Sequence, residues 1–189
     1  MGREFELKFK ANAKALEEIR SLWQNWEEIS METTYFDTVD SRLSEKNCTL
    51  RRRMENGISV CTIKTPTTGF GRGEWDVQAP WCAETVTKLF AAAEQEAIPV
   101  ENLTPVCGAR FTRLAQTVEL PGCVVEIALD TGILMGGGKE IPLCELEVEY
   151  KAGSEAMAVA WAERLAQRFG LEAETKSKFR RASLLARGE

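Results

Sequence analysis

Acidic and basic side chains alternate with apolar ones at the start of the chain. Glu4, Glu6 and Lys8 stand at every second position, with Phe5 and Leu7 between them, in the stretch EFELK. This period-two spacing is typical of a β-strand with one charged face and one apolar face. On such a face, carboxylates can hold a divalent cation and ammonium groups can bind an anion. Both roles require that the charged face looks into the protein rather than into water.

The same alternation recurs in later segments, with both signs of charge and apolar residues at the intervening positions. The basic side chains in this pattern are Arg51, Arg53, Lys64, Arg72 and Arg113, and the acidic ones are Glu74, Asp76, Glu126, Asp130, Glu145, Glu147 and Glu149. In one arrangement the apolar faces form a core and the charges are solvated. In the other, amphipathic helices cover the apolar exterior of a barrel and the charges line its interior. The alternation alone fits both arrangements.

The elements that would position these side chains are strands joined mostly by hairpins. Strands are expected at residues 3–10, 28–38, 48–54, 58–65, 74–79, 108–120, 123–130 and 142–151. Helices are expected at 12–26, at 83–97 and between Ser154 and Gly170, with a short basic helix or strand at 176–186. Asn56-Gly57 is a strong hairpin signal, and Gly136–Gly138 indicates a further turn rather than a phosphate-binding loop. We therefore expect an α+β fold, a closed eight-stranded antiparallel β-barrel with helices packed on the outside.

The composition of the chain narrows the possible chemistry. The net charge of −5 and the pI near 5.1 argue against a general nucleic-acid partner. Histidine is absent from all 189 residues, which excludes Ser-His and Cys-His nucleophiles and histidine-ligated zinc. The six cysteines contain no CxxC pair, so we expect reduced thiols. We find no signal peptide or membrane-spanning run, and expect one cytoplasmic domain with no membrane partner.

Several short motifs follow one another along nearly the whole chain. They are EFELK (Glu4–Lys8), TTYFDT (Thr33–Thr38), LRRR (Leu50–Arg53), TIK (Thr62–Lys64), EIALD (Glu126–Asp130), CELEVE (Cys144–Glu149) and SK (Ser177–Lys178). In this order the set resembles the CYTH superfamily, also called triphosphate tunnel metalloenzymes. EIALD and CELEVE resemble its bacterial inorganic triphosphatase branch. The resemblance implies a single CYTH domain over residues 1–189, forming an eight-stranded tunnel that binds a triphosphate and a divalent metal.

The resemblance also implies a role for each charged position. The residues that match the family's metal-binding acids are Glu4, Glu6, Asp130, Glu145 and Glu147, with Glu126 as a further candidate on the same face, and the expected ion is Mg²⁺ or Mn²⁺. The residues that match its phosphate-binding bases are Lys8, Arg51, Arg53, Lys64, Arg113 and Lys178, with Arg72 as a further candidate beside a Gly-rich turn. Some relatives carry a second base two positions after Arg113. This chain has Ala115 there, so two alternatives are open: the phosphate is held less tightly at that point, or Arg110 supplies the contact.

The activity that the resemblance implies is metal-dependent hydrolysis of the terminal phosphoanhydride of a triphosphate. Inorganic tripolyphosphate, giving pyrophosphate and phosphate, is the first candidate substrate. The candidate catalytic groups are Glu4, Glu6, Lys8 and Lys64, because a carboxylate or a metal-activated water is the available base and a lysine can stabilise the leaving phosphate. We expect a triphosphate-containing small molecule as partner and a monomer or homodimer. The alternatives are a class IV adenylyl cyclase, a thiamine triphosphatase and a non-catalytic polyphosphate or nucleotide sensor.

Overall fold

The structure is a computed structural model that describes residues 2–66 and 72–189, and of residues 2–4 and 72 only the backbone. Within these ranges ten strands form one antiparallel sheet. Its hydrogen-bonded order is β1 (Gly2–Glu4), β6 (Arg72–Gln78), β5 (Ile58–Pro66), β4 (Thr49–Glu55), β3 (Glu27–Asp37), β7 (Thr104–Leu120), β8 (Cys123–Gly136), β9 (Lys139–Gly153), β2 (Glu6–Lys10) and β10 (Glu172–Ala173). The helices are α1 (Ala13–Arg20), α2 (Arg42–Glu45), α3 (Ala83–Ala92), α4 (Glu155–Arg168) and α5 (Lys178–Arg187), and a 3-10 turn spans Val100–Asn102.

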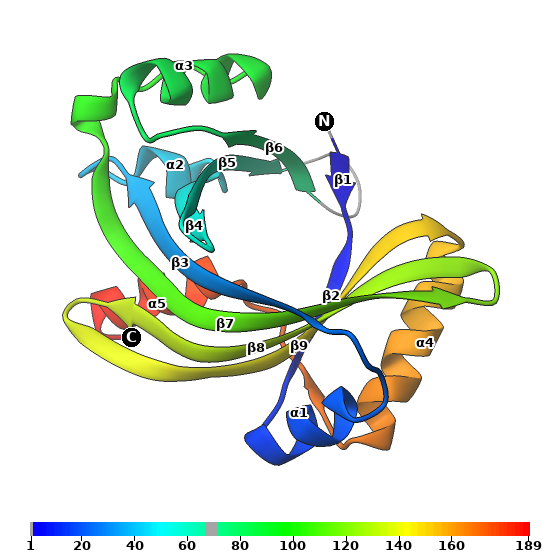
Figure 1. Cartoon of the computed structure of the whole chain (residues 1–189). Coiled ribbons are helices and arrows are strands. Elements are labelled where there is room, and N and C mark those ends of the chain that lie inside the picture. The colour runs from blue at the N-terminus through cyan, green and yellow to red at the C-terminus, as the bar shows by residue number, and fades with distance from the viewer. Residues whose placement is uncertain (1, 67–71) are drawn as a thin grey trace.

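The closed eight-stranded barrel expected from the sequence is wrong. A barrel closes only when its first and last strands pair, and the described end strands, β1 and β10, have no pairing with each other. The strand expected at 3–10 is divided at Phe5, because β1 pairs with β6 whereas β2 pairs with β9. Figure 1 shows the resulting open sheet curled into a trough, with β4–β6 folded over toward β7–β9 and with β1 and β2 running between the two halves.

Two apolar clusters cover the convex face of the sheet, as the alternation predicts. Under α1 and α4, Ile19 and Ala162 pack with Ile127 and Leu146 in a fully or almost fully buried cluster. Under α3, Phe90 packs with core residues of β4 and β5, among them Leu50 and Ile63. Each cluster removes large aliphatic and aromatic side chains from water, at about 25 cal/mol per Å² of apolar surface. The apolar positions of the strands therefore face outward under helices, and the charged positions face into the trough.

Helix α5 departs from the expectation that the helices lie outside the sheet. Its Ala182 is fully buried against Met31, Leu134 and Leu143 on the concave face. The approach is close because Gly136 carries no side chain: a Cβ there would lie 2.3 Å from the carbonyl oxygen of Ala182. This apolar end of the trough needs a cover, and α5 provides it. The helix thereby enters the side of the sheet on which the charged residues lie.

Several element boundaries differ from those expected. α1 ends at Arg20 instead of 26, because the Trp26 indole N–H donates to the carbonyl oxygen of Arg20 (3.0 Å) and Asn25 takes a left-handed conformation (φ +62°). α3 likewise ends at Ala92 rather than 97. The hairpin turns at Asn56-Gly57 and Gly136–Gly138 are confirmed by the register of their flanking strands. In the part of the chain that the structure describes, no helix is long and apolar enough to cross a membrane.

Candidate functional site

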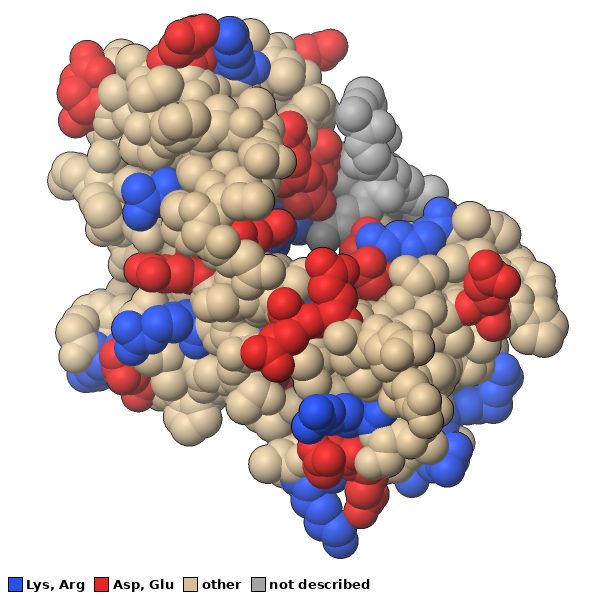
Figure 2. All heavy atoms as spheres, viewed as in Figure 1, with Lys and Arg blue, Asp and Glu red and all other residues tan. Residues whose placement is uncertain are grey.

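One pocket on the concave face brings together the basic residues singled out in the sequence. The predicted phosphate-binding residues that line it are Lys8, Arg51, Arg53, Lys64, Arg113 and Lys178. Two predicted metal-binding acids, Glu6 and Glu147, line it as well. These side chains come from β2, β4, β5, β7, β9 and α5. Figure 2 shows acidic and basic side chains gathered around a hollow between the two halves of the molecule.

Three carboxylates cluster beside the pocket, and one of them, Glu147, lines it, whereas Asp130 and Glu145 are not among its lining residues. Asp130, Glu145 and Glu147 each offer an oxygen, and these oxygens lie within 4.8 Å of one another. Strand register explains the cluster, because Asp130 on β8 stands directly opposite Glu145 on β9, and Glu147 follows on the same face. The Asp130 and Glu145 side chains have no solvent exposure. Buried carboxylates at this spacing require compensating positive charge.

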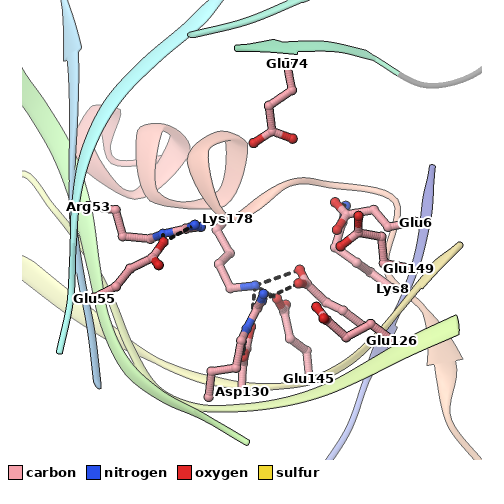
Figure 3. Close-up of polar contacts among 12 residues, drawn as sticks. Glu6, Lys8, Arg53, Glu55, Glu74, Glu126, Asp130, Glu145, Glu149 and Lys178 are labelled. Carbon is pink, nitrogen blue, oxygen red and sulfur yellow. Dashed lines mark hydrogen bonds and ion pairs between the residues drawn. The ribbon is translucent and has the colours of Figure 1, made fainter. Parts of the chain in front are cut away.

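Three basic side chains supply that charge, and we call this set of six residues the carboxylate wall. Lys178 Nζ donates to Glu147 at 2.7 Å, lies 2.7 Å from Asp130 and also contacts Glu145. Arg113 donates to both Asp130 oxygens, at 2.8 and 2.7 Å, and also to Glu147. Arg181 donates to Glu145. Figure 3 shows the Lys178 side chain reaching from α5 toward Asp130 and Glu145. Three acids and three bases therefore neutralise one another out of water.

The protonation states follow from this pairing. Burial alone would lower the pKa of Lys178, but attraction from Glu147, Asp130 and Glu145 raises that pKa above its usual range. Burial alone would raise the pKa of Glu147, but Lys178 and Arg113 hold it well below its usual range. For Glu145 the effect of burial prevails and raises the pKa. At neutral pH the Lys178 ammonium and the Glu147 carboxylate are therefore both charged.

The opposite side of the pocket carries Arg51, Arg53 and Lys64, which we call the basic wall. Glu74 on β6 lies 3.4 Å from Arg51 and 3.3 Å from Lys64, and Arg53 donates to Glu55. Burial, followed by repulsion from Arg51, lowers the pKa of Arg53. In Figure 3 Glu74 points from β6 toward the centre of the trough. The side chains of the basic wall are thus 13 to 18% exposed, and the carboxylates of Glu55 and Glu74 lie against them.

A row of acids lies at one edge of the carboxylate wall. Glu126, Glu149 and Glu6 stand opposite one another on β8, β9 and β2. Lys8 donates to Glu6 at 2.6 Å, and Lys151 lies 2.9 Å from Glu149 and 3.6 Å from Glu126. Like charges directly opposite in a sheet repel, so these lysines stabilise the row. Glu126 shares the face of the predicted metal-binding acids, but it is not among the residues that line the pocket.

Three further residues that the sequence analysis named, Glu4, Arg72 and Arg110, are not among the described residues that line the pocket. The side chains of Glu4 and Arg72 lie outside the described residues, although their backbones stand opposite each other in β1 and β6. Arg110 does not replace the base missing at Ala115, because its side chain is 62% exposed and lies 3.8 Å from Glu140. As the third residue before Arg113 in the same strand, it points to the other face of the sheet.

The sequence reasoning assigned no site role to three charged residues that the structure places here. Arg181 pairs with Glu145, Glu149 lines the pocket, and Glu74 holds two residues of the basic wall. Sequence signals existed for all three. Arg181 follows Lys178 at the i+3 spacing that puts two side chains on one helix face. Glu149 continues the alternation of Glu145 and Glu147, and Glu74 belongs to the alternation of Arg72 and Asp76.

The donor set of the carboxylate wall fits a hard divalent cation. Asp130, Glu145 and Glu147 offer oxygen atoms alone, which suits Mg²⁺ or Mn²⁺ better than it suits metals that prefer nitrogen or sulfur. Their mutual spacing allows more than one of them to reach a single ion. The same carboxylates are ion-paired with Lys178 and Arg113, so an ion that binds here exchanges with, or moves, these basic groups.

Comparison with known families agrees with the fold and the pocket. The CYTH domain model matches residues 2–183, which is nearly the whole chain. The protein therefore belongs to the CYTH domain family, as the order of its motifs predicts.

Individual relatives were found both by sequence and by structure. The inorganic triphosphatase of Haemophilus influenzae is 28% identical over 161 residues, which are 80% of this chain and 45% of that protein. The chain thus spans about half the length of that relative. The PH1819 protein of Pyrococcus horikoshii OT3 has a TM-score of 0.67 at 23% identity, with 98% of this chain and 99% of that chain covered. HpAC1 from Hippeastrum, described as an adenylyl cyclase with a dominant triphosphatase activity, has a TM-score of 0.65 at 18% identity, with 98% and 96% covered. At these identities the solved structures establish a shared fold alone.

Proposed function

We propose that the protein hydrolyses the terminal phosphoanhydride bond of a triphosphate in the presence of a divalent metal, with inorganic tripolyphosphate as substrate. The observation that supports this proposal is the pocket itself, where basic side chains from several strands and α5 lie together with Glu147, one of a buried triad of carboxylates. A relative named inorganic triphosphatase, 28% identical over 80% of this chain, supports the same substrate.

The two walls would bind the phosphate chain between them. Arg51, Arg53 and Lys64 would contact phosphate oxygens from one side, and Lys8 and Lys178 from the other. Arginine and lysine form strong charge-assisted hydrogen bonds with phosphate. The carboxylates that now hold the basic wall, Glu55 and Glu74, occupy these donors as the phosphates would. Substrate binding then exchanges one anion for another, which limits the cost of desolvating the bases.

Asp130, Glu145 and Glu147 are the residues that would hold Mg²⁺ or Mn²⁺. When bound, the ion supplies positive charge that polarises phosphate oxygens and lowers the repulsion felt by an incoming water. Arg113 and Lys178 orient these carboxylates through the hydrogen bonds described above. The basic side chains on both walls hold the phosphate chain in one geometry, which reduces the entropy cost of the reaction.

The reaction transfers the terminal phosphoryl group to water. The water oxygen forms a bond with the terminal phosphorus, the bond from that phosphorus to the bridging oxygen breaks, and the leaving pyrophosphate keeps the electron pair. Glu6, with Glu4 as the second candidate, would accept the proton of the water. Burial would lower the pKa of Lys8, but Glu6 and Glu147 raise it above its usual value. The Lys8 ammonium therefore remains charged at neutral pH and would stabilise the leaving group, as would Lys64.

The proposal is tested by phosphate release from tripolyphosphate, ATP and thiamine triphosphate with Mg²⁺ or Mn²⁺. We expect tripolyphosphate to give the highest kcat/KM. Glu147→Gln should lower kcat by about 100-fold or more, since it removes negative charge from the carboxylate triad. The matched control is Glu140→Gln on the same strand, whose side chain is 57% exposed and lies outside the pocket.

Other outcomes would assign a different function. Formation of cyclic AMP from ATP would identify a cyclase, and a preference for thiamine triphosphate would identify a thiamine triphosphatase. Binding of all three substrates without phosphate release would identify a sensor. Full activity in Glu147→Gln would show that the carboxylate wall takes no part in the reaction.

A further inference from the structure

A second cavity adjoins the pocket where α5 begins. It shares Lys8, Thr49, Ser177 and Phe179 with the pocket and continues outward from them. Beyond the shared residues its lining includes Lys176, Arg180, Arg187, Ser44, Asn47 and Thr175, and we call this part the outer vestibule. The two cavities therefore adjoin at these four shared residues.

The charge of the vestibule differs from that of the pocket. No acidic residue is among the described residues that line it. The side chains of Lys176, Arg180 and Arg187 have no ion pair or hydrogen bond to any other described residue. In the pocket, by contrast, each basic residue lies against a carboxylate. Neighbouring cations with no counter-ion repel one another, and an anion placed between them relieves that repulsion.

The sequence of α5 explains how these bases come together. Arg180 and Arg187 are seven residues apart and Ser183 lies between them, so all three share one face of the helix. The fully buried Ala182 holds the neighbouring face against the sheet. Ser177 caps the first turn by accepting from the N–H of Arg180 at 3.1 Å, and the positive end of the helix dipole points into the same region.

We propose that the outer vestibule binds the phosphates of a linear polyphosphate that extend beyond the three held in the pocket, so that the protein acts on chains longer than tripolyphosphate. This inference rests on the proposed function, since it assigns the chain length accepted by the same site. The lining favours phosphate over a nucleoside because cations, hydroxyls and an amide dominate it. Phe179 is the one aromatic residue among its described lining residues, and its ring already packs against Tyr35 with centroids 5.2 Å apart.

The test compares tripolyphosphate with a longer linear polyphosphate on the full chain, and includes ATP as a third ligand. The variant is Lys176→Gln/Arg180→Gln, which removes two exposed charges from the vestibule and leaves every pocket residue in place. The matched control is Lys14→Gln/Lys88→Gln, which removes two charges from α1 and α3, where the side chains are 87% and 70% exposed. Arg187→Gln alone is an independent second variant at the other end of the same helix face.

Two readouts separate this inference from the proposed function. The first is kcat/KM with Mg²⁺ for each ligand. The second is calorimetric affinity for each ligand in the Glu147→Gln background, which reports binding whether or not the protein turns over tripolyphosphate. In the vestibule variant we expect affinity and kcat/KM for the longer chain to fall about 10-fold or more, the size of one lost charge-assisted contact. The affinity and the kcat/KM for tripolyphosphate should change less than about 2-fold.

Three results would overturn the inference. The first is an unchanged ratio of the two affinities. The second is an equal loss for both ligands, or the same loss in the control variant, which would indicate general attraction of anions to a positive surface. The third is a loss confined to ATP, which would assign the vestibule to a nucleoside. Absence of tripolyphosphate hydrolysis in the wild type would refute the proposed function while leaving the affinity ratio as a valid test of the vestibule.

Discussion

The two walls of the pocket hold charge in different ways. On the carboxylate wall, three acids and three bases share hydrogen bonds, and the Asp130 and Glu145 side chains have no exposure to solvent. On the basic wall, Arg51, Arg53 and Lys64 are held by Glu55 and Glu74 at partly exposed positions. A charge on the first wall cannot change without leaving a buried partner uncompensated. A charge on the second wall can exchange its partner for a phosphate at lower cost.

The two walls lie on different parts of the sheet, and we expect them to have different roles. The carboxylate wall has a fixed arrangement, built on three neighbouring strands and anchored by Lys178 and Arg181 from α5. The basic wall lies on the hairpin of β4 and β5, whose carboxylate partners come from β4 and β6. We expect the first wall to determine stability and metal binding and the second to determine substrate affinity.

The largest expected effect contrasts the two walls in stability. Lys178→Met should lower the free energy of unfolding by about 3–5 kcal/mol, because it leaves buried carboxylates without their main counter-ion. Arg53→Met should cost roughly 1 kcal/mol, because Glu55 remains partly exposed to water. Urea denaturation of the metal-free proteins at neutral pH measures both. Lys176→Met, two residues from Lys178 and exposed, is the control and should lie within about 0.5 kcal/mol of wild type. An equal loss of unfolding free energy in Lys178→Met and Arg53→Met would refute the expectation that the carboxylate wall determines stability.

The next effect is stabilisation by metal. Mg²⁺ or Mn²⁺ at about 100 times its dissociation constant should raise the free energy of unfolding by about 2.7 kcal/mol. In Lys178→Met the ion should raise the free energy of unfolding by at least as much, because the ion then replaces a missing positive charge. Asp130→Asn should gain less, since it removes a charged ligand from the triad. Thermal unfolding with the ion or with a chelator measures the shift. The same melting temperature in both conditions would exclude the carboxylate wall as a metal site.

The pH dependence of stability tests the pairing within the carboxylate wall. The depressed pKa of Glu147 means that its stabilisation is fully present above the usual carboxyl pKa of about 4.3 and is lost as pH falls through the folded-state pKa. The stability gap between wild type and Glu147→Gln should therefore narrow in acid. Burial raises the pKa of Glu145, so the gap to Glu145→Gln should change in the opposite direction. Urea denaturation across the acid range measures both gaps, and parallel trends would contradict these pKa directions.

The smallest expected effect lies outside both walls. Arg110→Gln should change the free energy of unfolding by less than about 0.5 kcal/mol and leave kcat/KM unchanged, because its partner Glu140 is a surface contact at 3.8 Å. Arg113→Gln, three residues further along the same strand, provides the contrast in the same assays. A large loss of tripolyphosphate hydrolysis in Arg110→Gln would show that this side chain reaches the substrate from the other face.

The sequence predicted the local features of the molecule well where neighbours along the chain decide them. Alternation in EFELK, LRRR, EIALD and CELEVE places charges on one face and apolar residues on the other, and this is what the sheet shows. The turn at Asn56-Gly57 was predictable because its two residues favour a hairpin whatever surrounds them. The extent of α1 was not, because it depends on Trp26 reaching back to the carbonyl oxygen of Arg20.

Closure of the sheet and the position of α5 could not be predicted from local pattern. Strand 3–10 reads as one strand, yet its two parts pair with different partners, because β6 and β9 lie on opposite halves of the curled sheet. Residues 176–186 fit either a helix or a strand. Their place on the concave face depends on Leu134 and Leu143, which need an apolar cover, and on Gly136, which allows close approach.

The sequence by itself determined which residues share a face, and with it the set of acids and bases available to the site, because side-chain direction in a strand follows from position alone. Its ordered motifs also determined the family. Only the tertiary structure decided which charges meet. Lys178 and Arg181 reach Glu145 from more than thirty positions along the chain, once α5 has packed into the trough. Such pairing depends on the packing of distant elements, and no local spacing encodes it.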